Sequence, residues 1–160
     1  MAQKTYVFDV ELVGFEEITR RISARGDLTL IDLHYALQAA FGWDDDHLYS
    51  FWLEESFWAP GADRYTLPCH AAQPPAPGTN PKSAQIHLDE LALSTGQGLA
   101  YVFDFGSEWR VSLHVREIAD DDGSASPRLL GWDGSAPPQY GAIKAHQRKR
   151  AFASAAGART

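Results

Sequence analysis

Side chains suited to acid–base or metal chemistry occur at three places in the chain. His34 lies within an apolar pattern of helical period, His47 follows three consecutive aspartates, and Asp104 follows an alternating aromatic run. Histidine titrates near neutral pH, and a neighbouring carboxylate can orient its ring and stabilise its charged form. Together with Arg110, these side chains form a candidate polar groove between a helix and a sheet. If the fold brings His34, His47 and Asp104 together, the chain is a small enzyme or a metal-binding protein.

The same residues also have more ordinary interpretations. A histidine on an apolar helical stripe is typically buried and bonded to a backbone carbonyl, and the aspartates at 44–46 are typical of a solvated acidic turn. The sequence contains no G-x-S-x-G nucleophile motif and no glycine-rich phosphate loop. The one cysteine, Cys69, precedes a histidine in a proline-rich segment, an arrangement that does not make a catalytic pair. We therefore expect no cofactor and no metal.

A second set of candidates is aromatic. Trp43, Trp52 and Trp58 surround a predicted strand, and Trp52 lies on the strand face opposite Tyr49 and Phe51. Either these tryptophans pack in the interior, or they form an exposed aromatic patch that binds a protein or a small ligand.

Charge is unevenly distributed along the chain. Residues 144–160 hold 5 of the 14 basic residues and none of the 21 acidic ones, which leaves an acidic body at residues 1–143. An acidic surface repels nucleic-acid phosphates, so contacts with nucleic acid are expected only from the tail. The candidate contact residues are Lys144, Arg148, Lys149 and Arg150. We expect residues 1–143 to form a single domain and residues 144–160 to form a mobile basic tail.

No segment of the sequence indicates export or membrane insertion. The first residues lack the apolar stretch of a secretory signal, and no run of about 18 apolar residues is present. A single cysteine cannot form an internal disulfide. A cytoplasmic location and no membrane partner are expected.

Hydrophobic periodicity predicts the elements that must position these candidates. A leucine stripe predicts a helix over residues 29–41, with Thr29 as its N-cap and Gly42 at its end. The prolines in residues 68–81 predict a loop there. Period-two alternation predicts the strands. They cover residues 6–12, 18–22, 47–53, 99–105 and 109–115, with a weaker strand at 64–67.

The last two predicted strands form a hairpin around Gly106 and Ser107. Their apolar faces coincide only if the connecting loop has an odd number of residues. A three-residue loop at 106–108, with a bulge, is the smallest that satisfies this condition. That register places Asp104 opposite Arg110 as a cross-strand ion pair.

Two segments carry a family resemblance: LTLIDLHYALQAAFGWDDDHLYSF and YVFDFGSEWRVSLHV. They resemble the plasmid pRiA ORF-three-like family, whose members occur on plasmids and transposable elements and in bacterial and archaeal genomes. The resemblance covers about residues 4–141. This chain has Thr19 where a tryptophan is common, Ser107 where an aspartate is usual and Arg110 where a histidine is common. The resemblance implies an α+β fold and an association with mobile DNA, and no biochemical activity.

The sequence thus predicts an α+β protein with an antiparallel sheet of four or five strands and one principal helix packed on it. The expected function is a non-catalytic binding or accessory protein associated with mobile genetic elements, whose partner is an unknown protein or small ligand. The first alternative is an enzyme or metal-binding protein using the three candidate residues His34, His47 and Asp104. The second is nucleic-acid binding through the basic tail.

Overall fold

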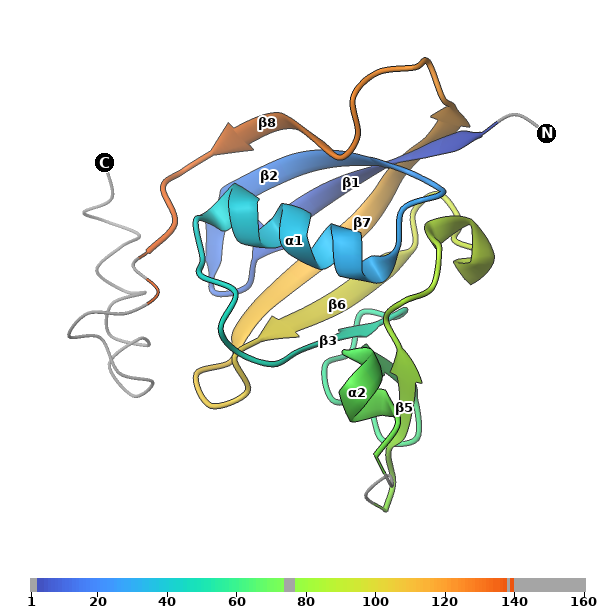
Figure 1. Ribbon diagram of the computed structural model, residues 1–160. Coiled ribbons are helices and arrows are strands. Elements are labelled where there is room, and N and C mark those ends of the chain that lie inside the picture. Colours follow the sequence, from blue (N-terminus) through green and yellow to red (C-terminus); the bar gives the residue numbers. More distant parts are fainter. Residues whose placement is uncertain (1–2, 74–76, 138, 140–160) are drawn as a thin grey trace.

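A computed structural model describes residues 3–73, 77–137 and 139. The main feature is one eight-stranded sheet in the order β5-β4-β3-β6-β7-β1-β2-β8 (Figure 1). All neighbouring strands are antiparallel except β4 and β5, which are parallel. The strands are β1 Lys4–Leu12, β2 Phe15–Arg25, β3 Tyr49–Trp52, β4 Asp63–Thr66, β5 Asn80–Ser83, β6 Gly98–Phe103, β7 Trp109–Asp120 and β8 Arg128–Asp133.

The principal helix, α1, spans Leu30–Phe41 as its leucine stripe predicts. Thr29 accepts a hydrogen bond from the backbone N–H of Asp32, whose carboxylate accepts one from the backbone N–H of Thr29, so the capping box is confirmed. Gly42 ends the helix with φ of 69°, a left-handed conformation that a glycine adopts without strain.

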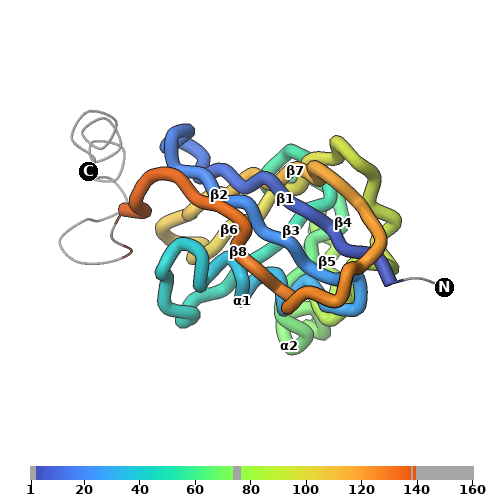
Figure 2. Tube along the Cα trace, turned by 90° about the horizontal axis from the view of Figure 1, so that it is seen from above, coloured from blue at the N-terminus to red at the C-terminus, as the bar shows by residue number. Residues whose placement is uncertain are grey.

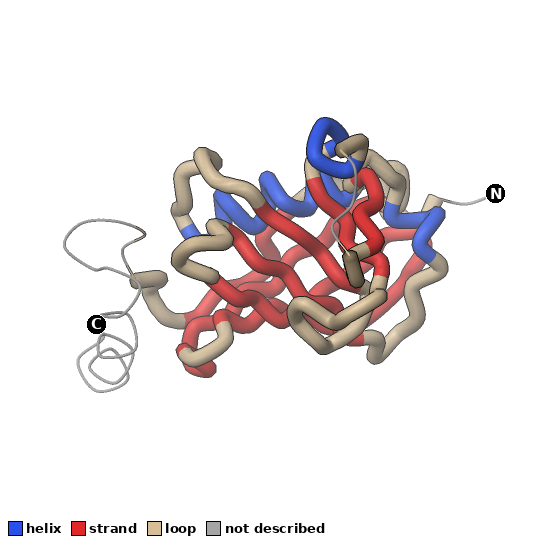
Figure 3. Tube along the Cα trace, turned by 90° about the horizontal axis from the view of Figure 1, so that it is seen from below, coloured by secondary structure: helices blue, strands red, loops and turns tan. Residues whose placement is uncertain are grey.

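The helices lie on one side of the sheet, which is here called the helix face, and the opposite side is the outer face (Figures 2 and 3). A four-residue helix, α2, spans Pro68–Ala71 beside β4 and β5, and a 3-10 turn, η1, spans Leu88–Leu91. None of the helices in the described ranges combines the length and apolar character that crossing a membrane requires.

The main core lies between α1 and the helix face. The alternating side chains Tyr6, Phe8, Val10 and Leu12 of β1 are all buried there, as their period-two pattern predicts. A smaller core lies on the outer face, where Trp52, Ala100 and Val102 are buried against the chain around Phe57, Ala62 and Phe105. The strands β3 and β6 are therefore buried on both faces, which explains their nearly continuous apolar sequences.

The predicted fold class is wrong. The structure is mostly sheet, with eight strands in mixed pairing rather than four or five antiparallel strands beneath one helix. The prediction missed the two edge strands. Strand β5 contains Pro81, which an edge strand tolerates because one side of it needs no hydrogen bonds. Strand β8 has mostly exposed residues and a bulge between Leu129 and Gly131, so it lacks clean alternation. The segment predicted as a proline-rich loop likewise contains α2 and part of β5.

The register predicted for the β6–β7 hairpin is also wrong. The strands pair Phe103 with Trp109 and Val102 with Arg110, so the loop has five residues, 104–108. The loop still has an odd number of residues, which is the condition for the apolar faces of β6 and β7 to coincide. The loop is longer because Asp104 leaves the ladder with φ of 66°, and its carboxylate accepts a hydrogen bond from the Ser107 N–H.

Candidate functional site

His34 lies in a buried hydrogen-bonded network between α1 and the sheet. Its Nδ1 is 2.7 Å from the Tyr101 hydroxyl and its Nε2 is 2.7 Å from Oδ1 of Asp45. The Gln38 side-chain amide donates to the same hydroxyl at 2.9 Å, and the His34 ring stacks on Tyr49 with centroids 3.7 Å apart. A carboxylate can only accept, so Nε2 carries the proton and Nδ1 accepts from the Tyr101 O–H. One arrangement of protons thus satisfies both ring nitrogens of a neutral histidine.

Burial sets the charge state of this network. It lowers the pKa of His34, and the hydrogen bond and negative charge of Asp45, which act in the opposite direction, do not offset it. Burial also raises the pKa of the Tyr101 hydroxyl well above its usual value. Both groups are therefore neutral near pH 7. Because both His34 nitrogens are occupied by protein groups, the network holds the chain at Asp45 against α1 and β6.

We expect the free energy of unfolding to fall as the pH drops below about 6.5, in part because of His34. The folded state lowers the pKa of His34 from its ordinary 6.5, so the unfolded chain binds the proton more readily. The stabilisation is complete above 6.5 and is lost as the pH falls toward the folded pKa. Urea unfolding at several pH values between about 5 and 7.5 should show a weaker pH dependence for His34→Gln than for wild type. Parallel curves for the two proteins would rule out this contribution.

The other members of the predicted polar groove lie in two different places. His47 Nε2 is 3.6 Å from Oδ2 of Asp104 and 3.6 Å from Oδ1 of Asp46. Arg110 lies elsewhere, on the outer face, where it donates to Glu108. The structure thus brings His47 and Asp104 together, places His34 in its own network, and opposes Arg110 to Val102 rather than to Asp104.

The aspartates that follow α1 do not assemble a cluster of ligands. Within residues 3–73, 77–137 and 139, no group of three or more His, Cys, Asp or Glu side chains is arranged to hold a metal ion. Asp45 hydrogen-bonds to His34, whereas Asp44 is tied through its backbone N–H and C=O to the side chain of Gln139. The predicted nucleic-acid contacts, Lys144, Arg148, Lys149 and Arg150, lie outside the described residues.

The three candidate tryptophans do not share one surface. Trp43 is buried in the main core, stacked on Phe103 with centroids 5.5 Å apart. Trp52 is buried in the smaller core of the outer face, and Trp58 is 37% exposed beside it. The expected aromatic patch therefore reduces to Trp52 and Trp58, which have a third aromatic neighbour, Phe105.

These three rings border an open pocket of about 270 Å³, here called the aromatic pocket. The centroids of Trp52 and Trp58 are 5.1 Å apart, as are those of Trp58 and Phe105, and both pairs meet edge to face. Strand β4 contributes Arg64, and the remaining wall comes from Ala59, Pro60, Ala62 and residues 78–80. The pocket is thus built from three separate parts of the chain on the outer face.

Arg64 is the cation of the aromatic pocket. One Nη donates to Ser50 at 3.0 Å, and the guanidinium carbon lies 6.0 Å from the Trp58 centroid and 5.9 Å from the Phe105 centroid. The Nε is buried and has no hydrogen-bond partner in the described part of the chain. Burial lowers the pKa of Arg64, and no carboxylate among the described residues forms an ion pair with it. A partly buried positive charge is thus left without a counterion.

Backbone strain is concentrated around the aromatic pocket. Four non-glycine residues in the described ranges have positive φ, and three of them are Trp58, Asp104 and Glu108, at 55°, 66° and 52°. Trp58 forms part of the pocket wall, and the other two belong to the loop that carries Phe105. Such strain costs about 1 to 3 kcal/mol per residue and accumulates at functional sites. It favours a function for these two segments.

Glu108 links the same two segments. Its Oε1 accepts hydrogen bonds from Trp58 Nε1 at 3.1 Å and from Nε and Nη2 of Arg110 at 2.9 and 2.7 Å, and the Arg110 guanidinium lies over the Phe57 ring. Burial alone would raise the pKa of Glu108, but the hydrogen bonds from Arg110 and Trp58 outweigh it and hold the pKa below its usual value. The resulting carboxylate fixes the orientation of the Trp58 ring.

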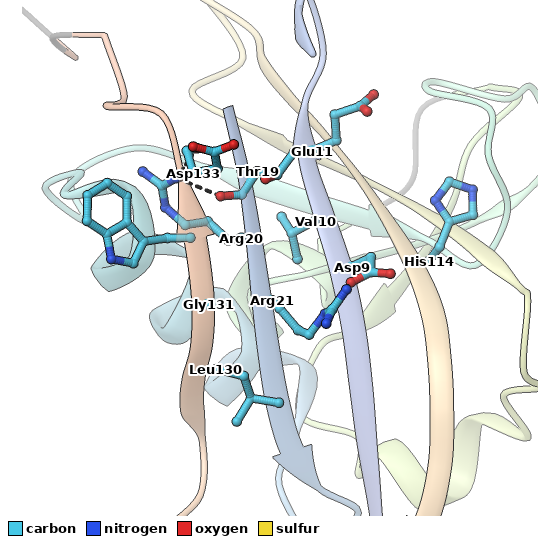
Figure 4. Close-up of a pocket in the computed structure, with 11 residues that line it drawn as sticks. Asp9, Val10, Glu11, Thr19, Arg20, Arg21, His114, Leu130, Gly131 and Asp133 are labelled. Atoms are coloured by element: carbon cyan, nitrogen blue, oxygen red, sulfur yellow. Dashed lines mark hydrogen bonds and ion pairs between the residues drawn. The ribbon is translucent and has the colours of Figure 1, made fainter. Parts of the chain in front are cut away.

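A larger cleft of about 400 Å³ lies over β1, β2 and β8 (Figure 4). Several of its charged groups already have partners within the protein. Asp9 accepts from Arg21 at 2.8 Å and from Arg116 at 3.3 Å, and these hydrogen bonds keep its pKa below the usual value although burial acts to raise it. Arg20 donates to backbone carbonyls, including that of Ala40. Because both arginines of this cleft, Arg20 and Arg21, already have protein partners, the cleft is a weaker candidate for binding an anion than the aromatic pocket.

Sequence reasoning did not select Arg64 or Phe105. A partial signal was present, because Arg64 alternates with Tyr65 in a predicted strand and so must lie on the opposite face. The pairing of β4 with β3, which brings Arg64 beside Trp52, is not encoded in either segment alone.

Comparison with known proteins agrees with the resemblance noted in the sequence. The chain is 28% identical over 124 residues to the uncharacterized protein y4hQ of Sinorhizobium fredii (strain NBRC 101917 / NGR234), covering 76% of this chain and 58% of that protein. The chain therefore spans less than two thirds of that relative. The crystal structure of MM3350, a protein of unknown function from Methanosarcina mazei Go1, superposes with a TM-score of 0.71 at 24% identity, covering 87% of this chain and 75% of that one. At this identity the likeness shows a shared fold.

The family model described as plasmid pRiA4b ORF-3-like protein matches residues 4–151, which is most of the chain. The predicted resemblance is confirmed, and the chain belongs to the plasmid pRiA4b ORF-3-like protein family.

Proposed function

We propose that this protein is a non-catalytic binding protein whose aromatic pocket holds a small anion with an apolar or aromatic ring. The observation that carries the proposal is the Arg64 guanidinium, which borders a pocket of three aromatic rings and has no carboxylate partner among the described residues. Because burying an uncompensated charge is unfavourable, a counter-charge from a ligand is the expected complement.

The chemistry of the pocket selects the ligand class. A guanidinium presents a planar set of N–H donors that matches a carboxylate, and the rings of Trp52, Trp58 and Phe105 offer faces and edges to another ring. The volume of about 270 Å³ lies just below the usual range of ligand pockets, about 300 to 1,000 Å³. One ring system with one anionic group fits this space better than a dinucleotide.

The lining favours binding over catalysis. The described residues around the aromatic pocket include no His, Cys, Asp, Glu or Lys that could act as a general base or nucleophile. An accessory role on a mobile genetic element is a further part of the proposal and rests on the family name alone.

Arg64→Met is expected to weaken carboxylate binding without unfolding the protein. Indole-3-acetate and benzoate should raise the melting temperature of the wild type, because a ligand at 100 times its Kd stabilises the folded state by about 2.7 kcal/mol. The uncharged amides of both compounds should have no effect. Loss of the charge-assisted hydrogen bonds should weaken carboxylate binding by about tenfold or more. The free energy of unfolding without ligand should change by less than about 1 kcal/mol, because removal of an unpaired charge offsets the lost contact with Ser50.

Arg116→Met is the matched control, since it removes an arginine from the same face but outside the aromatic pocket. This variant should bind the carboxylates as the wild type does. Equal responses to the acids and their amides, or full binding by Arg64→Met, would refute the proposed ligand class.

A further inference from the structure

The two edges of the sheet differ in how well they are protected against pairing with another strand. Strand β5 carries Pro81 and Lys82, and proline and lysine are residues that natural edge strands use to prevent such pairing. Strand β8 has neither. It instead exposes Leu129 by 46%, Leu130 by 41% and Trp132 by 66%. The β8 edge is therefore the more apolar of the two.

A bulge determines which β8 side chains share a face. Trp132 pairs with Arg20 and Leu129 with Ile22, with Leu130 as the extra residue between them. Arg20 and Ile22 are buried on the helix face, so Trp132 and Leu129 lie on that face too, although residues three apart in a regular strand lie on opposite faces.

The terminal residues of β8 share the other face. Arg128 pairs with Ser23, and Asp133 pairs with Thr19. Ser23 and Thr19 lie one and three positions from Ile22 along β2, so both point to the face opposite Ile22. Arg128 and Asp133 thus lie on the outer face. Both are exposed, and neither forms an ion pair with another described residue.

We propose that β8 pairs antiparallel with β8 of a second copy of this chain, about a twofold axis between Leu130 and Gly131. In this register Arg128 lies opposite Asp133 of the second copy, Leu129 opposite Trp132, and Leu130 opposite Gly131. The axis repeats each pair, so the interface contains two Arg–Asp pairs and two Leu–Trp pairs.

The faces are compatible only because of the bulge. Edge-to-edge pairing about an axis perpendicular to the sheet keeps each face on its own side, so opposed residues must share a face. In a regular strand Arg128 and Asp133, which are five positions apart, would lie on opposite faces and could not be opposed in this register. With the bulge, the charged pair meets on the outer face and the apolar pair on the helix face, where the Trp132 ring already lies 5.6 Å from the Arg20 guanidinium.

The dimer leaves the aromatic pocket open. Strand β8 is at one edge of the sheet, whereas the pocket lies beside β3 and β4, near the opposite edge. Joining two eight-stranded sheets through β8 therefore places the two pockets at the far ends of one continuous sheet. Association and ligand binding are thus separate properties.

Charge reversal on the full chain tests both the partner and the register. Sedimentation equilibrium of the wild type should give twice the 17.7 kDa of one chain. R128D and D133R should each weaken association by at least tenfold, because each variant places like charges opposite each other at two symmetric positions. R128D/D133R together restore opposite charges in the same register and should recover the dimer. K82E, on the β5 edge, should leave the dimer unchanged.

Melting curves show whether each variant is folded. Should D133R fail to fold, L129K replaces it in the test, since Leu129 is exposed and a lysine there should give a folded monomer. A monomeric wild type at millimolar concentration would overturn the proposal. A folded double variant that associates no better than the single ones would overturn the register, and so would a dimer that tolerates L129K.

Discussion

Leu37→Ala is expected to lower the free energy of unfolding by about 2 to 5 kcal/mol. Leu37 is fully buried at the centre of the α1 stripe, and α1 is the main cover of the helix face. Truncation removes the transfer free energy of the lost methyl groups and leaves a cavity that the long strands beneath cannot easily close. Urea unfolding monitored by tryptophan fluorescence gives the value directly.

Tyr35→Ala is the control on the same helix, because Tyr35 is mostly exposed. Its effect should stay below about 1 kcal/mol. A loss of less than about 0.5 kcal/mol for Leu37→Ala, or a larger loss for Tyr35→Ala, would mean that α1 presents a different face to the core.

Tyr101→Phe is expected to destabilise the protein by about 2 to 4 kcal/mol, whereas Tyr49→Phe should be close to neutral. The Tyr101 hydroxyl bonds to His34 and Gln38, so its removal leaves two buried polar groups unsatisfied, at about 1 to 3 kcal/mol each. The Tyr49 hydroxyl is also buried but has no hydrogen-bond partner among the described residues. Both substitutions remove one oxygen atom from neighbouring strands of the same sheet.

The difference between these two variants isolates the hydrogen bonds from the shared loss of volume. Chemical unfolding of both proteins in one buffer at pH 7.5 provides the comparison. If Tyr49→Phe cost as much as Tyr101→Phe, the His34 network would contribute nothing specific to stability.

The elements that could be predicted from the sequence are those specified by neighbouring residues. The helix at α1 follows from a leucine stripe, Thr29 and Gly42, all within one short segment. Strands β1 and β2 follow from the period-two alternation of their apolar residues. In contrast, β5 and β8 are edge strands with at most one strand partner, and neither needs a regular apolar pattern to keep its place.

The β6–β7 register shows how a non-local contact overrides a local rule. The alternation of the two strands correctly requires an odd number of loop residues. However, Asp104 adopts a left-handed conformation and its N–H donates to the Leu48 carbonyl at 2.8 Å. That contact, 56 positions away along the chain, lies outside the hairpin. The cross-strand pair of Asp104 with Arg110 could not form once the loop contained Asp104.

The candidate sites depend on similar long-range pairings. His34 could be selected for its position on the helix, but its partner Tyr101 lies 67 positions away and has no local signal. The run of aspartates predicts a solvated turn at Asp45, although one carboxylate oxygen of Asp45 bonds to His34. The sequence indicates Trp52 and Trp58 as aromatic candidates, whereas Arg64 lies beside them because β4 pairs with β3.

The most direct test of the proposed function is the NMR signal of the Arg64 side-chain Nε–H. This group belongs to the guanidinium that borders the pocket and has no carboxylate partner among the described residues, so its signal should respond to an anion that binds there. Titration of ¹⁵N-labelled protein with indole-3-acetate should move this signal downfield, with smaller shifts at Trp52 and Trp58, and indole-3-acetamide should leave it in place. An Arg64 signal that does not respond to saturating indole-3-acetate or benzoate, or that responds equally to acid and amide, would contradict the assignment of the aromatic pocket as an anion-binding site.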